Sequence, residues 1–124
     1  MSLLRSQRGF TLIELIATLV ILGVLASIAV PKYYDITRES QNRAALQAVT
    51  EGKARLSMNY ARLFLENASP PGATSLVFAV GSTANVGDYT LTFSTITASS
   101  DIKIIVSGKA GVQGINSGVW LMPK

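Results

Sequence analysis

The chain has no cysteine and no histidine, and charged residues make up only 15% of its 124 positions. Without these two side chains it cannot form a disulfide bond, offer a thiol nucleophile or an imidazole base, or build the usual zinc sites. Aromatic residues are also few, at 7%, and aromatics on a packed helix usually belong to a core. The composition gives catalysis little support, and we expect a protein that is not an enzyme.

Ligand-binding motifs are scarce as well. Asp88 and Asp101 are isolated acids beside turn residues, where aspartate is common for backbone reasons. Residues 108–118 are rich in glycine but contain no acid, and no Lys-Ser/Thr pair follows them as in a phosphate-binding loop. We therefore expect no metal, no cofactor and no small-molecule substrate. The net charge of +4 is modest, and no basic tract suits nucleic acid.

The main feature that is present is an apolar run at residues 10–30, which contains one charge, Glu14. A helix of this length spans about 30 Å, the thickness of the hydrocarbon core of a bilayer. A helix in a globular core is the alternative, but such a helix normally has a polar face. Besides Glu14 the run has only two threonines and one serine, whose hydroxyls can bond to the preceding turn. We predict one membrane-capable helix followed by a water-soluble part.

The residues before this run carry only positive charge. Arg5 and Arg8 precede it and residues 1–9 contain no acid, which favours a cytoplasmic N-terminus. A secretory signal is one alternative, since residues 26–29 (Ala-Ser-Ile-Ala) weakly mimic its cleavage site. However, Gly9 is a small residue placed before the run, and a cut there would remove the basic residues and keep the helix.

Beyond Pro31 the pattern becomes amphipathic. Apolar or small residues recur every three or four positions, and charged residues occupy the opposite face. Residues 67–72 (Asn-Ala-Ser-Pro-Pro-Gly) end the helix. The sequence therefore predicts one long helix from near Phe10 to near Glu66, with an irregularity at Pro31. The side chains expected on its buried face are Ala45, Val49, Gly52, Leu56, Tyr60, Leu63 and Phe64.

The rest of the chain predicts short strands separated by turns. Strands are expected from alternating or continuous apolar residues at 76–80, 89–95, 102–106 and 119–122, and turns at 81, 85–88, 99–101 and 108–118. A small antiparallel sheet would lay its apolar face on the stripe of the helix, because the sheet alone is too small to be stable. The predicted fold class is α+β: a long N-terminal α-helix, membrane-spanning in its first half, packed against a small antiparallel β-sheet.

One segment carries a family resemblance. Residues 8–15 (Arg-Gly-Phe-Thr-Leu-Ile-Glu-Leu) and the run that ends in Pro31 resemble the N-terminal segment of type IV pilins and type II secretion pseudopilins. The resemblance covers residues 5–34 and is specific, because glycine before phenylalanine, glutamate as the fifth residue after the cut and proline at the end of the run all coincide. It implies that a membrane-embedded prepilin peptidase cuts between Gly9 and Phe10 and then methylates the amine of Phe10.

The resemblance also implies a role for Glu14. A carboxylate costs about 3 kcal/mol in hydrocarbon, and a buried charge persists where it is paired. A cut after Gly9 would create one cation in an apolar region, the amine of Phe10. The family's pairing joins the glutamate of one subunit to this amine of its neighbour and sets the register of assembly, with Thr11 beside it as an assembly residue. The alternative is that Glu14 complements the amine or the helix dipole of its own chain.

Gly23 and Pro31 weaken the helix in its first half. The resemblance implies a locally unwound segment between such positions in assembled filaments. A simpler interpretation, compatible with the first, is that Gly23 lets helices pack closely and Pro31 marks the membrane exit.

The predicted organisation has four parts. Residues 1–9 are a leader peptide that is removed, 10–31 the transmembrane and filament-core helix, 32–67 its amphipathic continuation, and 68–124 a small sheet that forms one globular domain with 32–67.

The resemblance implies a structural subunit that polymerises into a type IV pilus, with adhesion, motility or DNA uptake as outcomes at the level of the filament. Its partners would be further copies of itself, the prepilin peptidase, the inner-membrane assembly platform and the membrane. It would begin as a single-pass inner-membrane protein with a cytoplasmic N-terminus and end in an extracellular pilus or a periplasmic pseudopilus. A pseudopilin of a secretion or competence system is the alternative, and an anchor that never polymerises is a third.

Overall fold

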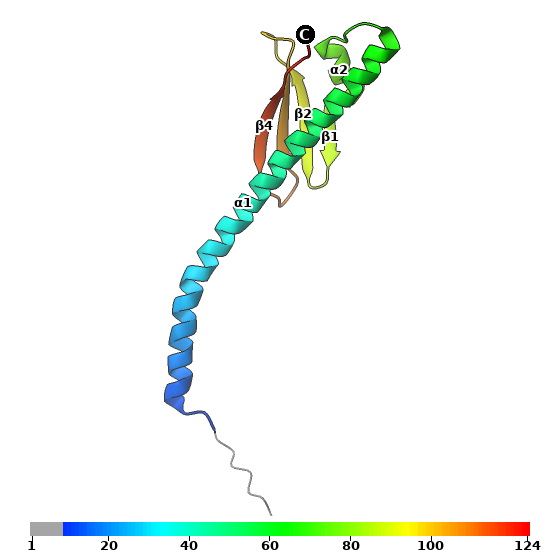
Figure 1. Cartoon of the computed structure of the whole chain (residues 1–124). Helices are drawn as coiled ribbons and strands as arrows, with labels where there is room; N and C mark the ends of the chain where they lie inside the picture. Colours follow the sequence, from blue (N-terminus) through cyan, green and yellow to red (C-terminus); the bar gives the residue numbers. More distant parts are fainter. Residues whose placement is uncertain (1–8) are drawn as a thin grey trace, which may run out of the picture. The chain divides into compact units, whose positions relative to one another are not determined.

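The computed structural model describes residues 9–124. In that range, helix α1 (Leu12–Asn67) is followed by α2 (Ala73–Val80) and by strands β1 (Thr83–Val86), β2 (Tyr89–Thr95), β3 (Ile102–Gly108) and β4 (Ile115–Trp120) (Figure 1). The chain divides into two units, one ending at Ile36 and the other covering Thr37–Lys124, and α1 contributes to both. A long helix with a small antiparallel sheet confirms the predicted fold class, and α1 has nearly the predicted bounds.

The four strands form one antiparallel sheet in the order β1-β2-β3-β4, so each strand pairs with the next one in sequence. Gly87 and Asp88 make the two-residue turn between β1 and β2, and Gly87 has a φ of +55°, which favours glycine. The alternation predicted for β2 and β3 is confirmed, because their inward side chains are buried: Tyr89, Leu91, Phe93, Ile102, Ile104 and Val106.

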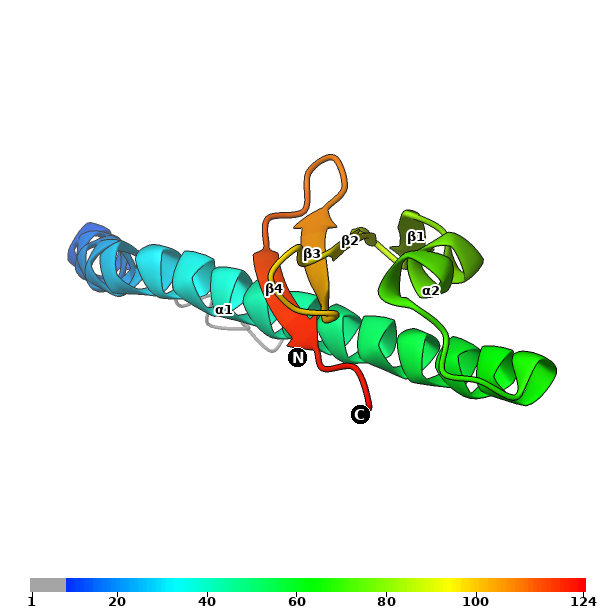
Figure 2. The same cartoon turned by 90° about the horizontal axis from the view of Figure 1, so that it is seen from above.

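The core lies between this sheet and α1. Seen from above, the strands group beside the cyan-to-green part of the helix (Figure 2). Of the predicted stripe, the first four members are buried, Tyr60 and Leu63 are half-buried, and Phe64 is 43% exposed. Gly52 allows the close approach, since a Cβ there would lie 2.8 Å from Leu91 Cδ2 and 3.2 Å from Ile104 Cγ2.

Residues 76–80 were predicted as a strand, and this prediction is wrong, because they belong to helix α2. A short apolar run fits either element, and here the half-buried and buried positions follow helical spacing at Ala73, Leu76, Val77 and Val80. Gly81 ends the helix, with a φ of +89° and its N–H donating to the carbonyl of Val77 at 2.9 Å. α2 packs against β2 and buries Leu76 completely.

Two further boundaries differ from the prediction. β1 occupies residues 83–86, part of which was expected to be a turn, and β4 begins at Ile115, inside the expected 108–118 turn. Glycine at 118 hides the strand pattern, yet it is required there, since a Cβ would lie 2.6 Å from Val49 Cγ1 on α1. Trp120 then closes the contact, its indole Nε1–H donating to Ser57 Oγ at 3.0 Å.

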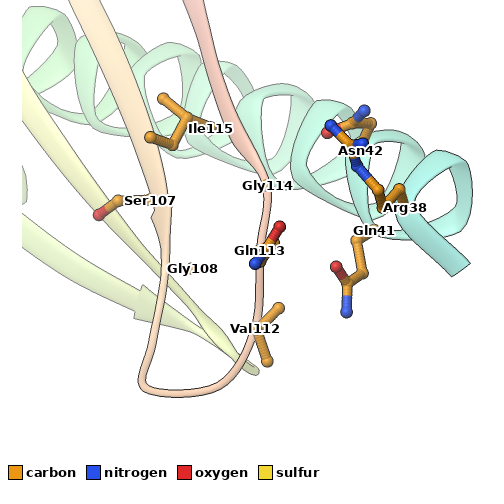
Figure 3. A pocket seen from close by; sticks show the side chains of 9 residues that line it. All are labelled: Arg38, Gln41, Asn42, Ser107, Gly108, Val112, Gln113, Gly114 and Ile115. Atoms are coloured by element: carbon orange, nitrogen blue, oxygen red, sulfur yellow. The ribbon is translucent and has the colours of Figure 1, made fainter. Parts of the chain in front are cut away.

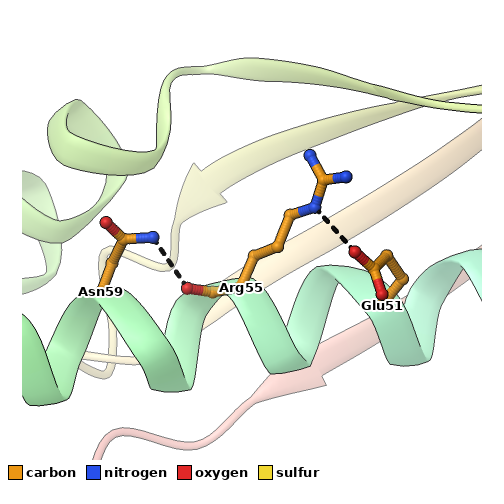
Figure 4. Close-up of polar contacts among 3 residues, drawn as sticks. All are labelled: Glu51, Arg55 and Asn59. Carbon is orange, nitrogen blue, oxygen red and sulfur yellow. Dashed lines mark hydrogen bonds and ion pairs between the residues drawn. The ribbon is translucent and has the colours of Figure 1, made fainter.

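The outer face of α1 carries i,i+4 ion pairs. Arg55 Nε donates to Glu51 Oε1 at 3.0 Å, and Asn59 Nδ2 donates to the carbonyl of Arg55 at 2.9 Å (Figure 4). Similar pairs join Arg43 to Glu39 and Arg62 to Glu66. These residues are the charged face that the sequence predicts for the second half of the helix.

Candidate assembly site

The predicted site residues lie at the start of α1. Gly9, Phe10 and Thr11 precede the first helical residue, Leu12, and Phe10 is 92% exposed. The predicted leader, residues 1–9, lies outside the described residues except for Gly9. A Cβ on Gly9 would meet nothing within 4 Å among residues 9–124. No contact within that range therefore requires glycine at this position.

Thr11 and Glu14 form a reciprocal hydrogen-bonded cap. The N–H of Thr11 donates to Glu14 Oε2 at 2.8 Å, and the N–H of Glu14 donates to Thr11 Oγ1 at 3.3 Å. The hydroxyl of Thr11 also donates to Glu14 Oε2, at 2.9 Å. This is a capping box, which satisfies two of the orphan N–H groups at a helix start. The sequence signature of such a box is Thr-x-x-Glu before an apolar run, as at residues 11–14.

This cap uses one of the two oxygens of the Glu14 carboxylate. Among the described residues, its hydrogen bonds all go to Oε2, so Oε1 is available to a further donor. In the single chain Glu14 thus caps the start of its own helix. Its pairing with a neighbouring amine stays a prediction.

The apolar half of α1 has no covering within the single chain. Every residue from Leu12 to Ile36 is exposed, and among the described residues α1 is the one helix apolar enough to cross a membrane. Its hydroxyls are satisfied internally, as expected: Thr18 donates to the carbonyl of Leu15 and Ser27 to that of Val24. A helix of this kind needs an apolar environment supplied from outside the chain.

Gly23 and Pro31 both lie inside a continuous helix. A Cβ on Gly23 would meet nothing within 4 Å in the described part of the chain, so no contact within this chain requires glycine there. Pro31 has no N–H, which leaves the carbonyl four residues earlier without its helical donor. The unwound segment expected in filaments concerns an assembled state and stays a prediction.

An open pocket of about 470 Å³ lies between α1 and the loop from β3 to β4 (Figure 3). Arg38, Gln41 and Gln113 contribute polar groups to its lining, and these suit a polar or anionic group. None of the predicted site residues lines it. Within residues 9–124 no three acidic side chains cluster as metal ligands would.

Comparisons with known proteins give one family match and several relatives. Residues 4–30 match the family described as the prokaryotic N-terminal methylation motif. The chain is 40% identical over 65 residues to a fimbrial protein of Pseudomonas aeruginosa, covering 44% of this chain and 42% of that protein. It is 34% identical over 83 residues to a fimbrial protein of Neisseria meningitidis serogroup B, covering 67% of this chain and 46% of that protein.

A third relative is named a type IV major alpha-pilin, from Moraxella bovis, with 42% identity over 50 residues that cover 40% of this chain and 31% of the relative. The chain therefore spans less than half the length of each of these relatives. No solved structure is significantly similar to it.

Proposed function

We propose that this chain, which belongs to the type IV pilin family, is a structural subunit that polymerises into a pilus filament. The observation that carries the proposal is the first half of α1: an apolar helix exposed on every side in the single chain, with one carboxylate at its start. A membrane can cover such a helix before assembly, and the same helices of further copies can cover it afterwards. The structural role leaves the chain no catalytic task.

Processing would come first. A prepilin peptidase cuts between Gly9 and Phe10 and methylates the new amine, which separates residues 1–9 from the helix. The non-helical, exposed backbone at these two residues supports this step, because a protease needs an extended segment that it can reach. Since no contact within residues 9–124 excludes a side chain at position 9, a need for glycine there would come from the peptidase.

Assembly would follow through Glu14. Its Oε2 remains in the capping box with Thr11, and its Oε1 accepts the amine of Phe10 from a neighbouring subunit. The threonine aims the carboxylate, and the neighbour neutralises it in an apolar region where an unpaired charge is costly. Only one axial offset of two helices brings the two charges together, so the pair sets the register.

The test replaces Glu14 by glutamine. Glutamine at this position keeps the capping box but removes the charge, so Glu14→Gln separates the two roles of the side chain. We expect normal cleavage, measured by the mass and N-terminus of the chain, and a large loss of filaments in the fraction sheared from cells. Glu39→Gln, another exposed acid on α1, is the matched control and should assemble normally. Normal filaments from Glu14→Gln would refute the pairing.

A second variant tests processing alone. Gly9→Val should leave the fold intact and block the cut, so that the full-length chain accumulates in the membrane. A product starting at Phe10 in that variant would refute the cut site. Wild-type chain that starts at a methylated Phe10 yet never enters the sheared fraction would instead favour a pseudopilin role over a surface pilus.

A further inference from the structure

The outer face of the sheet has two unlike halves. On β1 and β2 the outward side chains are all polar: Thr83, Asn85, Thr90, Thr92 and Ser94. On β3 and β4 the outward side chains are mixed: Ile105, Ile115 and Val119 are 36%, 80% and 41% exposed, and they share this face with Lys103, Ser107 and Ser117, Lys103 being paired with Val119. Ile105 pairs with Ser117, which lies between the other two along β4. Two of these apolar side chains, Ile115 and Val119, therefore lie on β4, the edge strand of the sheet among the described residues.

The two edge strands of the sheet differ in length. Neither contains a charged residue or a proline, but β1 has four residues and β4 has six. The N–H of Ser117 donates to its neighbour Asn116 Oδ1 at 2.8 Å, so it points away from β3, and N–H groups two residues away point the same way. Edge strands that carry no charge, proline or bulge are templates for strand pairing.

An unpaired cation lies below this edge. A Cβ on Gly118 would be 3.3 Å from Lys53 Cε and 3.8 Å from its Nζ, so β4 crosses α1 at Lys53. Among residues 9–124, Lys53 forms no ion pair. A strand added beside β4 would thus meet Ile115 and Val119 on its outer face, with Lys103 one strand further away, and the charge of Lys53 on its inner face.

We propose that β4 binds an extended segment of another polypeptide as a fifth strand of the sheet. The segment is apolar at the alternate positions that continue the row of Ile115 and Val119, and it carries an acid on the face toward Lys53. Backbone pairing supplies affinity and the alternate side chains supply selectivity.

A second copy of this chain fits the edge less well. Pairing of two β4 strands would bring the Lys53 side chains of both copies to one side of the joined sheet, where like charges repel. The β1 strand of another copy would set Thr83 and Asn85 beside the apolar row. Charge and polarity both favour a different polypeptide.

The first test uses two synthetic ten-residue peptides of alternating valine and threonine, with one central threonine replaced by glutamate or by lysine. Binding is measured by fluorescence anisotropy to the full chain in detergent micelles. We expect the glutamate peptide to bind about fivefold more tightly, the fold-change of one exposed ion pair. Lys53→Glu should reverse this preference, whereas Lys103→Glu, the same charge change on β3, should not. Equal binding of both peptides, or no reversal, overturns the proposal.

The second test asks whether the peptides bind at the edge of β4, and whether a second copy of the chain binds there instead. Val119→Lys should weaken both peptides, and Thr83→Lys on the other edge should weaken neither; the reverse result overturns the proposal. Because the chain has no cysteine, Ser117→Cys introduces a unique thiol. Rapid formation of a disulfide-linked dimer through this position would identify a second copy as the occupant and refute a separate partner. The fluorescence of Trp120 verifies folding in each variant, and filament yield is a separate readout.

Discussion

Between Leu12 and Ile36 the apolar side chains of α1 are all exposed in the single chain, whereas between Ala45 and Leu56 the same helix buries five residues against the sheet. Backbone geometry does not distinguish the two regions, since both are α-helix. Side-chain patterning does: from Leu15 to Val30 the first region has no charged residue on any side, and the second has one apolar stripe and one charged face. The first therefore needs an apolar environment from outside the chain, and the second is stabilised by its own chain.

The largest effect is expected from a pair of leucine-to-alanine substitutions, one in each region. Leu56→Ala removes a side chain that is fully buried under the sheet and should cost about 2–5 kcal/mol of unfolding free energy. Leu22→Ala removes one that is 60% exposed and should leave this quantity unchanged. Urea unfolding of the full chain in micelles, followed by its single tryptophan, measures both. Equal losses would show that the two regions are not energetically separate.

Two glycines sharpen the contrast. Gly52→Ala places a methyl group against Leu91 and Ile104, so we expect a loss of about 1–3 kcal/mol from overpacking. Gly23→Ala meets nothing in the described chain and should leave the same unfolding transition in place. If Gly52→Ala were neutral, the close approach of helix and sheet would be more tolerant than the distances indicate.

The second region also contains a hydrogen bond whose strength depends on pH. The N–H of Met122 donates to Asp101 Oδ1 at 3.0 Å, and this bond, with help from the Ser99 hydroxyl and the charge of Lys124, lowers the pKa of Asp101 below its ordinary value of 3.8. A lowered folded pKa means that the stabilisation is complete above pH 3.8 and is lost as pH falls through the folded value.

Thermal unfolding of wild type and Asp101→Asn across this acid range checks the sign. The midpoint gap between them should be largest near neutral pH and should close in acid. A gap that widens on acidification would contradict the assignment.

The smallest effect concerns the exposed face of the second region. Glu51 and Arg55 are 47% and 38% exposed, so a double-mutant cycle to alanine should give a coupling of only about 0.2–0.5 kcal/mol, weakened by salt. A coupling above about 1 kcal/mol would mean that this face is less hydrated than an ordinary helix surface.

Sequence alone determined the long helix, its exposed first half, the stripe from Ala45 to Leu56 and the two central strands, because each follows from a local period of polarity or from an apolar run of membrane length. The sequence also marks Thr11 and Glu14 as notable residues. Their Thr-x-x-Glu spacing fits a capping box, and the hydrogen bonds that form it are seen in the structure. Two elements depended on partners that are distant in the chain. The helix at Leu76 forms where its apolar face packs against β2. Glycine at 118 is typical of a turn in the sequence, but in the structure it lies in β4 and allows the close approach of Val49. Tertiary packing decided these elements because short apolar runs and glycines are ambiguous until the surface that covers them is known.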